Sequence, residues 1–274
     1  MIAVEVLGRL GNQMFMYAFA VSASVRLRCP FVLSYDGKEF ELPEYFSCRR
    51  FSAMRNGCFS VLYRALRPWL PRQDWDSSQA PAAELARLKR FTTYFGYMQS
   101  EEYFAPFQEL IRSEFKILRA VARPFASKYG DRLRHARSVV LHFRRTDYQQ
   151  VGSTQLGFDL RLPLAYYDAC LNRIKDLPHC QVILVGDDLR EAAEHYRGRS
   201  NFFFERNEPM VDFQLIQAAD IAIISNSSFA WWAAYLGKPG RTIFAPKNWL
   251  GFKAGFEYPT GICSVPWCWV EVPE

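Results

Sequence analysis

The sequence lacks several patterns that would place it in a familiar class of protein. Its seven cysteines are odd in number and irregularly spaced, without a C-x-x-C pair, so neither a disulfide framework nor a zinc site is expected. No apolar run reaches the roughly eighteen residues of a spanning helix, and no basic segment precedes an apolar stretch at the N-terminus, so no signal peptide is expected. A reducing compartment is the natural interpretation.

Features of nucleic-acid-binding proteins are also lacking. The net charge of +6 suits an anionic ligand or an anionic membrane surface without identifying either. However, the chain has no zinc-finger spacing, no aromatic RNP-like strand and no Lys-rich tail. We therefore expect no nucleic-acid partner.

Residues 45–73 contain no acidic side chain. This stretch interleaves aromatic residues with six arginines, namely Arg49, Arg50, Arg55, Arg64, Arg67 and Arg72. One interpretation is a solvated basic face over buried aromatic side chains. The other is a contact with anionic lipid or with an acceptor linked to lipid pyrophosphate.

What the chain does contain is an alternation of strand and helix patterns. Half of its 274 residues are hydrophobic, which suffices for a large core. Short apolar runs at 3–7, 138–143, 180–186, 221–225 and 241–246 alternate with helical patterns at 12–28, 163–174, 188–196, 212–220 and 227–237. This alternation predicts mostly parallel sheets in two α/β halves, 1–136 and 137–274, that face a cleft, with ligands at the carboxyl ends of the strands.

The first candidate motif is GRLGNQMF, residues 8–15, between a strand and a helix. Gly8 and Gly11 permit a tight turn and close approach of a ligand, and Arg9 can bind phosphate or sugar oxygens. Asn12 and Gln13 can donate from their amides or cap the helix. The spacing alone is equally compatible with an ordinary strand–helix turn, and it lacks the G-x-G-x-x-G of a dinucleotide site.

The second motif is LHFRRTDY, residues 141–148. Arg144 and Arg145 follow a buried strand, and a guanidinium makes bidentate contacts to phosphate. We expect one arginine to reach the ligand and the other to pair with Asp147 or a second carboxylate. His142 either contacts phosphate, orients an arginine or is a hydrogen-bonded core residue.

Acidic residues follow two further elements. Asp187 and Asp188 come after a strand and can accept from a nucleoside or cap a helix. Asp212 begins a helix from which its carboxylate could accept the N–H groups of guanine. The only D-x-D, at Asp74 and Asp76, lies in a Pro- and Ser-rich segment, 71–83, expected to be a loop, so no metal site is predicted.

The last motif is SNSSFAWW, residues 225–232. Asn226, Ser227, Ser228 and Phe229 lie between a strand and a helix, where backbone N–H groups and the helix dipole favour phosphate. Simple capping of the helix by the serines is the alternative.

Taken together, GRLGNQMF, H-x-R-R-x-D-Y and SNSSFxWWAAYL, in this order, resemble the alpha-1,2-fucosyltransferase family, in its bacterial type. The resemblance implies a two-domain GT-B-type fold, GDP-L-fucose as donor, inversion at the anomeric carbon and no metal. It implies that His142, Arg144, Arg145, Ser227 and Ser228 hold the diphosphate, with the N-terminal string near the donor and the reaction centre. Gly186 departs from the serine that is common at its position.

In a consistent mechanism, Arg144 and the helix start at Ser227–Phe229 stabilise the negative charge that develops on the departing GDP. Asp147 is the nearest candidate for a general base, unless it fixes Arg145. The resemblance implies a glycan acceptor, free or lipid-linked, and a galactose 2-hydroxyl as the site of transfer. Without an N-terminal anchor, we expect a bacterial cytoplasmic enzyme, with peripheral contact at the inner membrane left open.

Three other functions remain compatible with these residues. A related fucosyltransferase would form a 1,6 linkage or modify protein, and linkage analysis of the product would identify it. A non-catalytic module that binds nucleotide sugar or glycan would show no turnover. A dinucleotide-dependent oxidoreductase would bind NAD.

Overall fold

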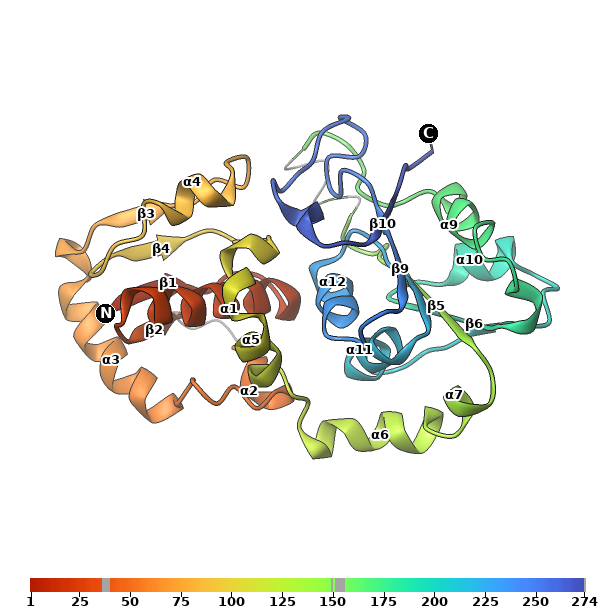
Figure 1. Ribbon diagram of the computed structural model, residues 1–274, viewed down its shortest axis with the longest axis horizontal. Coiled ribbons are helices and arrows are strands. Elements are labelled where there is room, and N and C mark those ends of the chain that lie inside the picture. The colour runs from red at the N-terminus through yellow and green to blue at the C-terminus, as the bar shows by residue number, and fades with distance from the viewer. Residues whose placement is uncertain (36–39, 149, 151–155, 274) are drawn as a thin grey trace. The chain divides into compact units, whose positions relative to one another are not determined.

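The computed structural model describes residues 1–35, 40–148, 150 and 156–273, except the side chain of Arg55. The chain forms two compact units. The first comprises Met1–Leu118 and Tyr258–Val265, and the second comprises Arg119–Glu257 and Pro266–Glu274. Figure 1 shows the elements of both units, coloured from red at the N-terminus to blue at the C-terminus.

The expected boundary between residues 136 and 137 is therefore wrong in two places. Residues 119–136 belong to the second unit, where Gln214 donates to the carbonyl of Val121 (3.2 Å). Residues 258–265 return to the first unit, where Ser100 donates to the carbonyl of Gly261 (2.7 Å). Both segments are bound by contacts between residues distant in sequence, which no local pattern reveals.

The first unit is built on a parallel sheet of order β2-β1-β4-β3. Its strands are β1 (Ile2–Glu5), β2 (Phe31–Ser34), β3 (Arg72–Asp74) and β4 (Thr93–Phe95). The segment expected to be a loop thus contains β3, because Arg72–Asp74 pairs with Thr93–Phe95.

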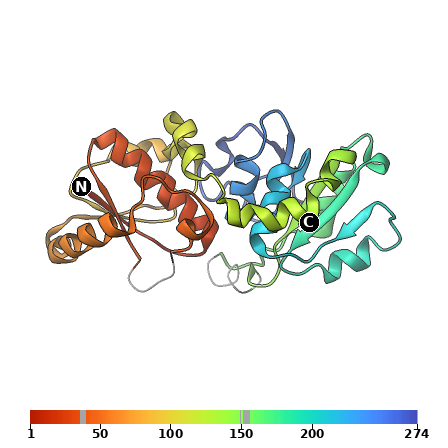
Figure 2. The ribbon, with the colours of Figure 1, turned by 90° about the horizontal axis from the view of Figure 1, so that it is seen from below.

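Helices of the first unit cover both faces of this sheet. They are α1 (Leu10–Leu27), α2 (Leu42–Tyr45), α3 (Ala53–Leu66), α4 (Pro81–Leu85) and α5 (Gln108–Glu114), with 3-10 turns η1 (Arg67–Trp69), η2 (Glu101–Tyr103), η3 (Ala105–Phe107) and η5 (Ile262–Ser264). Figure 2 shows α1 on one face and α3 on the other. α1 is buried from Met14 to Ala23 on nearly every side, which explains its uniformly apolar sequence.

The second unit carries a parallel sheet of order β10-β9-β8-β5-β6-β7. Its strands are β5 (Ser138–Phe143), β6 (Gln181–Gly186), β7 (Phe202–Phe204), β8 (Ile221–Ile223), β9 (Thr242–Pro246) and β10 (Cys268–Val270). Read from β7, the order is that of a doubly wound nucleotide-binding sheet, whose direction of winding reverses between β5 and β8. The carboxyl ends of these two strands are the expected place for a ligand.

Helices of the second unit connect these strands in the expected alternation. They are α6 (Arg119–Tyr129), α7 (Arg132–His135), α9 (Leu164–Leu171), α10 (Arg190–His195), α11 (Pro209–Ala218) and α12 (Ser228–Tyr235), with the 3-10 turn η4 (Leu177–His179). All six residues of β5 are buried, as expected for a central parallel strand. The predicted α/β fold with parallel sheets is confirmed.

Candidate active site

A hydrogen bond joins β5 to the segment after β8 at the point where the winding of the second sheet reverses. The Nδ1 atom of His142 lies 2.9 Å from the hydroxyl of Ser225. His142 is buried, and burial lowers its pKa to about 4. A neutral imidazole therefore lies beside the start of α12 at physiological pH.

Arg144 lies between two carboxylates at the end of β5. Its guanidinium donates to Asp147 (2.6 Å) and lies 3.3 Å from an oxygen of Asp187. It also stacks over the ring of Tyr148, 5.4 Å from the ring centre. Asp147 thus contacts Arg144, while Glu191 is the second carboxylate, beside Arg145.

Arg145 points elsewhere, because successive side chains diverge after the strand ends. Its guanidinium donates to the carbonyl of Leu162 (2.7 Å) and lies 3.3 Å from Glu191. With its side chain only 10% exposed, Arg145 fixes the loop that precedes α9. Of the two arginines, Arg144 is the one that remains beside the strand ends.

Asp187 organises the turn after β5. Its carboxylate accepts from the backbone N–H of Arg145 (2.8 Å) and from the hydroxyl of Thr146 (2.8 Å). Asp188 is held differently, because Arg190 donates to it from both backbone and side chain, and these bonds lower its pKa to about 2. Asp187 therefore supports Arg144 from a neighbouring strand, whereas Asp188 begins α10.

Gly186 allows β5 and β6 to approach closely at this point. Its φ is +147°, and a Cβ there would lie 2.2 Å from the carbonyl oxygen of Phe143. A serine at this position would collide with backbone, which cannot move aside as a flexible side chain can. The glycine that departs from the family pattern is thus required by the local geometry.

The start of α12 completes the strand-end cluster. Ser227 is the N-cap residue, yet its side chain makes no capping hydrogen bond, so the simple capping role considered from the sequence is not observed for it. Ser228 opens the helix, and the first N–H groups of any helix have no partner within it. Phe229 packs against the ring of His142, 6.0 Å between ring centres.

Asn226 holds this turn from inside. Its side-chain amide donates to the backbone carbonyl of Leu160 (2.9 Å), and its backbone carbonyl accepts from the hydroxyl of Tyr148 (3.0 Å). Burial raises the pKa of Tyr148 to about 12, so the phenol keeps its proton. Asn226 is 1% exposed and therefore shapes the site from behind its surface.

Asp212 lies in the first turn of α11 and is also buried. It accepts from the amide of Asn207 (2.9 Å), and burial raises its pKa to about 7. A carboxyl with this pKa is partly protonated near neutrality. Its 6% exposure leaves little surface for a nucleobase without movement of Asn207.

The N-terminal motif occupies the corresponding position in the first sheet, after β1. Gly8 has φ +70°, and its carbonyl accepts from the amide of Gln13 (3.2 Å). The side-chain oxygen of Gln13 accepts from the backbone N–H of Glu41 (2.9 Å). Gln13 is only 1% exposed and fixes the turn through both bonds. Gly11 is buried in α1, whereas Arg9 is exposed at its N-cap.

Asn12 connects this motif to the end of β4. Its side-chain oxygen accepts from the amide of Gln99 (2.7 Å), so the ends of neighbouring strands are again linked by side chains. Gln99 belongs to none of the sequence motifs, and the contact of Ser225, the first residue of SNSSFAWW, with His142 was not predicted. Each becomes visible only when adjacent strand ends are known.

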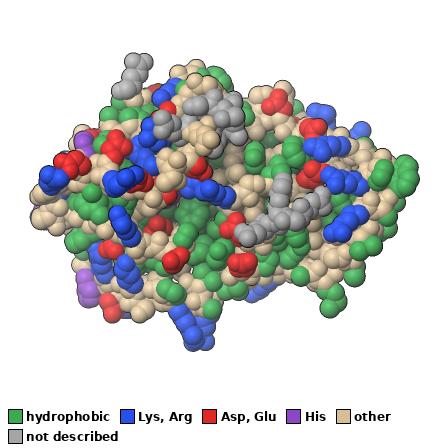
Figure 3. Space-filling view, turned by 180° about the vertical axis from the view of Figure 1, so that it is seen from behind, with side chains coloured by type: hydrophobic (Ala, Val, Ile, Leu, Met, Phe, Trp, Pro, Cys, Tyr) green, Lys and Arg blue, Asp and Glu red, His purple; other side chains and the backbone are tan. Residues whose placement is uncertain are grey.

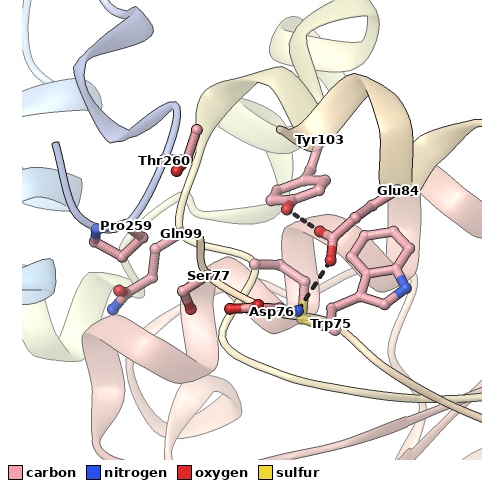
Figure 4. A pocket seen from close by; sticks show the side chains of 9 residues that line it. Trp75, Asp76, Ser77, Glu84, Gln99, Tyr103, Pro259 and Thr260 are labelled. Carbon is pink, nitrogen blue, oxygen red and sulfur yellow. Dashed lines mark hydrogen bonds between the residues drawn. The ribbon is translucent and has the colours of Figure 1, made fainter. Parts of the chain in front are cut away.

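A polar pocket in the first unit includes Gln99. It is lined by Trp75, Asp76, Ser77, Glu84, Met98, Gln99, Tyr103, Pro259 and Thr260. Figure 4 shows Glu84 turned toward the Tyr103 hydroxyl and the Asp76 backbone, both of which donate to it. Burial raises the pKa of Glu84, although the two hydrogen bonds, which stabilise the charged carboxylate, act in the opposite direction.

Metal ligands do not gather in the part of the chain that the structure describes, since no three His, Cys, Asp or Glu side chains are placed to hold an ion. Of the two residues in the D-x-D, Asp74 pairs with Arg72 and Asp76 accepts from Ser78. Among the described residues, no helix has the length and apolar character needed to cross a bilayer.

The sequence model of glycosyl transferase family 11 matches residues 65–260, which is most of the chain. The chain belongs to this family. The matched region includes the strand-end cluster of the second unit and the pocket of the first, whereas the N-terminal motif precedes it. Family 11 membership confirms the expected relationship to the alpha-1,2-fucosyltransferase family.

Curated relatives in the same range of length are bacterial glycosyltransferases. An alpha-1,2-colitosyltransferase of Escherichia coli is 28% identical to this chain, over 91% of this chain and 92% of the length of that enzyme. The O-antigen biosynthesis glycosyltransferase WbnK of Escherichia coli is 24% identical and covers 89% and 93%. This family 11 chain is thus a glycosyltransferase.

Solved structures support the fold. The NodZ alpha-1,6-fucosyltransferase of Bradyrhizobium, soaked with GDP-fucose, gives a TM-score of 0.51 at 14% identity, over 86% of this chain and 92% of its own. The likeness confirms the expected two-domain GT-B-type architecture for this family 11 protein.

Proposed function

We propose that this glycosyltransferase moves L-fucose from GDP-fucose to a glycan hydroxyl, the 2-hydroxyl of a galactose, with inversion and without a metal ion. The observation that carries the proposal is the cluster at the ends of β5 and β8 in a family 11 chain: Arg144 follows β5, α12 begins after β8, and His142 joins the two ends through Ser225. Guanidinium and backbone N–H groups at a helix start together suit a diphosphate.

Departure of GDP is the step that this cluster serves. The acceptor oxygen forms a bond to the anomeric carbon as the bond from that carbon to the β-phosphate oxygen breaks, and the acceptor proton passes to a base or to solvent. Negative charge grows on the β-phosphate, and Arg144 with the first N–H groups of α12 stabilises it. One such donor is worth on the order of 3–4 kcal/mol in the transition state.

Asp147 and Asp187 act on this step through Arg144. Their carboxylates hold the guanidinium from two sides, at 2.6 Å and 3.3 Å. An acid engaged in this way is better suited to position Arg144 than to remove a proton. We therefore assign Asp147 a positioning role in preference to that of general base.

The remaining residues of the predicted site fall into two groups. His142, Ser227, Ser228 and Phe229 lie at the strand-end cluster and form the diphosphate cradle. Arg145, Asn226, Asp188 and Asp212 shape it, and guanine recognition by Asp212 requires displacement of its Asn207 partner.

The acceptor belongs, in this proposal, to the first unit. Asn12 and Gln99 present amides at the ends of β1 and β4, and Arg9 is exposed beside them. Amides suit the hydroxyls of a neutral sugar. A surface-polysaccharide acceptor linked to lipid would bring the enzyme to the cytoplasmic face of the inner membrane.

Colitose is the second candidate for the transferred sugar, because the 28% identical relative is named a colitosyltransferase. Colitose is L-fucose without its 3-hydroxyl, so the two donors share the nucleotide and differ by one hydrogen-bonding group. The pairing with GDP is common to both.

The test measures GDP release with GDP-fucose and with GDP-colitose, in the presence of EDTA, with a panel of galactosides. Arg144→Ala is compared with Arg197→Ala, whose arginine is 75% exposed and pairs with Glu194 of α10. We expect turnover that survives EDTA and falls about 100- to 1000-fold in Arg144→Ala only. Linkage analysis of the product then distinguishes a 1,2 from a 1,6 bond.

Loss of turnover with EDTA would reject metal independence. Equal turnover in the Arg144→Ala and Arg197→Ala variants would reject the diphosphate cradle. Binding of GDP without turnover on any acceptor would favour a nucleotide-sugar-binding module.

A further inference from the structure

The outward face of α3 is apolar along its whole length. Met54, Cys58, Val61, Leu62 and Ala65 are exposed and follow each other at spacings of four, three, one and three residues, which places them on one side of a helix. Met54 is 83% exposed and Val61 69% exposed. We call these five residues the outer face of α3.

The opposite face of α3 already provides its packing. Phe59 and Tyr63 pack against Ala3 and Val32 of the sheet. Asn56 is buried and bonds to the backbone of Leu33. A helix needs only one apolar face to be held on a sheet, so the outer face is not explained by the fold.

Aromatic and cationic side chains border the outer face. Trp69, which follows α3 in η1, is 77% exposed. Arg64 is exposed one helical turn after Val61. Figure 3 shows hydrophobic side chains exposed at the margin of the first unit beside Lys and Arg side chains. Tryptophan and arginine next to an aliphatic stripe are typical of helices that lie in a membrane–water interface.

The charge around the outer face of α3 favours an anionic lipid surface over a second copy of the chain. Residues 45–73 contain six arginines and no acid, although Arg67 and Arg72 are paired with Glu5. An isologous dimer through this face would bring the same arginines of two copies together, which like-charge repulsion opposes. An anionic lipid surface offers both hydrocarbon and negative charge.

We propose that the outer face of α3, with Trp69, docks on an anionic lipid surface and holds the enzyme there without a spanning helix. The aliphatic side chains enter the boundary between headgroups and acyl chains, and the arginines contact phosphate. This binding is separate from sugar transfer, since none of these residues lies at either strand-end cluster.

The experiment is flotation of the full chain with vesicles of phosphatidylglycerol and phosphatidylcholine, compared with pure phosphatidylcholine. The test variant is Met54→Glu with Val61→Glu, and Trp69→Ser is a second. The matched control is Phe256→Ser, because Phe256 is 54% exposed in the second unit. All three change exposed side chains, so circular dichroism should show parental folding.

We expect the parent and the control to float with anionic vesicles and to be released by salt. Each test variant should lose about tenfold or more in partition, since buried apolar area and lipid charge both set this affinity. Transfer to a soluble galactoside, measured in the same preparations, should remain at the parental rate. That readout separates failure of docking from failure of the proposed transferase activity.

Two outcomes would overturn the proposal. One is equal flotation of the parent and both variants, or no flotation of the parent at all. The other is a concentration-dependent dimer in sedimentation that Met54→Glu with Val61→Glu abolishes, with no vesicle binding, which would assign this face to a second copy of the chain.

Discussion

The two units place different chemistry at equivalent points of their sheets. At the ends of β5 and β8, charged groups dominate, with Arg144 held by Asp147 and Asp187. At the ends of β1 and β4, the link is between two neutral amides, Asn12 and Gln99. In the proposed function, the charged cluster binds a diphosphate and the amide pair binds a sugar, so that two similar sheets would differ in ligand through the residues at their strand ends.

The glycines of the two sites provide the largest expected contrast. A Cβ at Gly186 would meet the backbone oxygen of Phe143 at 2.2 Å, whereas one at Gly8 would meet the side chain of Asn12 at 2.6 Å. Asn12 can rotate but the strand cannot. We expect Gly186→Ala to lower the free energy of unfolding by about 3 kcal/mol or more and Gly8→Ala by about 1 kcal/mol.

Urea denaturation of both variants checks this difference. Equal destabilisation would mean that β5 and β6 can separate locally, and that the charged cluster is less rigid than its hydrogen bonds indicate.

A second contrast concerns pH, because burial raises the pKa of Asp212 from 3.8 to about 7. The folded protein retains a proton that the unfolded chain releases, so this contribution is fully present below about pH 4 and is lost as pH rises through 7. Between about pH 5 and pH 8, the loss amounts to about 2–3 kcal/mol.

Asp212→Asn removes this titration while keeping the size of the side chain. Stability curves of parent and variant should therefore converge at acid pH and separate above neutrality, with the variant more stable. Parallel curves over the whole range would show that Asp212 is ionised in the folded protein. Asn12→Asp, in the amide-based site, gives a comparison in which a charge is added.

The smallest expected effect tests the amide link itself. Gln99→Ala removes the donor to Asn12 and one wall of the polar pocket. We expect the KM for a galactoside acceptor to rise about fivefold to tenfold, as for one lost neutral hydrogen bond, with affinity for GDP unchanged. A weakened affinity for GDP, measured by calorimetry, would contradict the assignment of the acceptor to the first unit.

Strands with an apolar run were predictable from sequence, including the three-residue β8, and strands without a recognised run were not. β5 and β6 each have six residues with an unbroken apolar run, so their positions were predicted almost to the residue. β4 and β7 have three residues each, and only their pairing with neighbours defines them. Local pattern contains no information about such pairing.

The candidate site divides in the same way. Sequence placed polar residues after each strand, because parallel strands end at one edge of a sheet. It did not show that Asp147 holds Arg144, nor that Ser225 meets His142 across two strands. Side-chain direction at a strand end depends on the turn that follows, and that turn depends on tertiary contacts such as those of Asp187.

Asn56 has a consequence for the solubility of the chain. Its side chain accepts from the backbone N–H of Leu33 (2.9 Å) and donates to the carbonyl of the same residue (3.1 Å). Because β2 is an edge strand, these bonds occupy the groups to which a strand from another molecule would pair. A single asparagine therefore blocks the addition of a strand at Leu33, beneath a helix whose outer face is itself exposed and apolar.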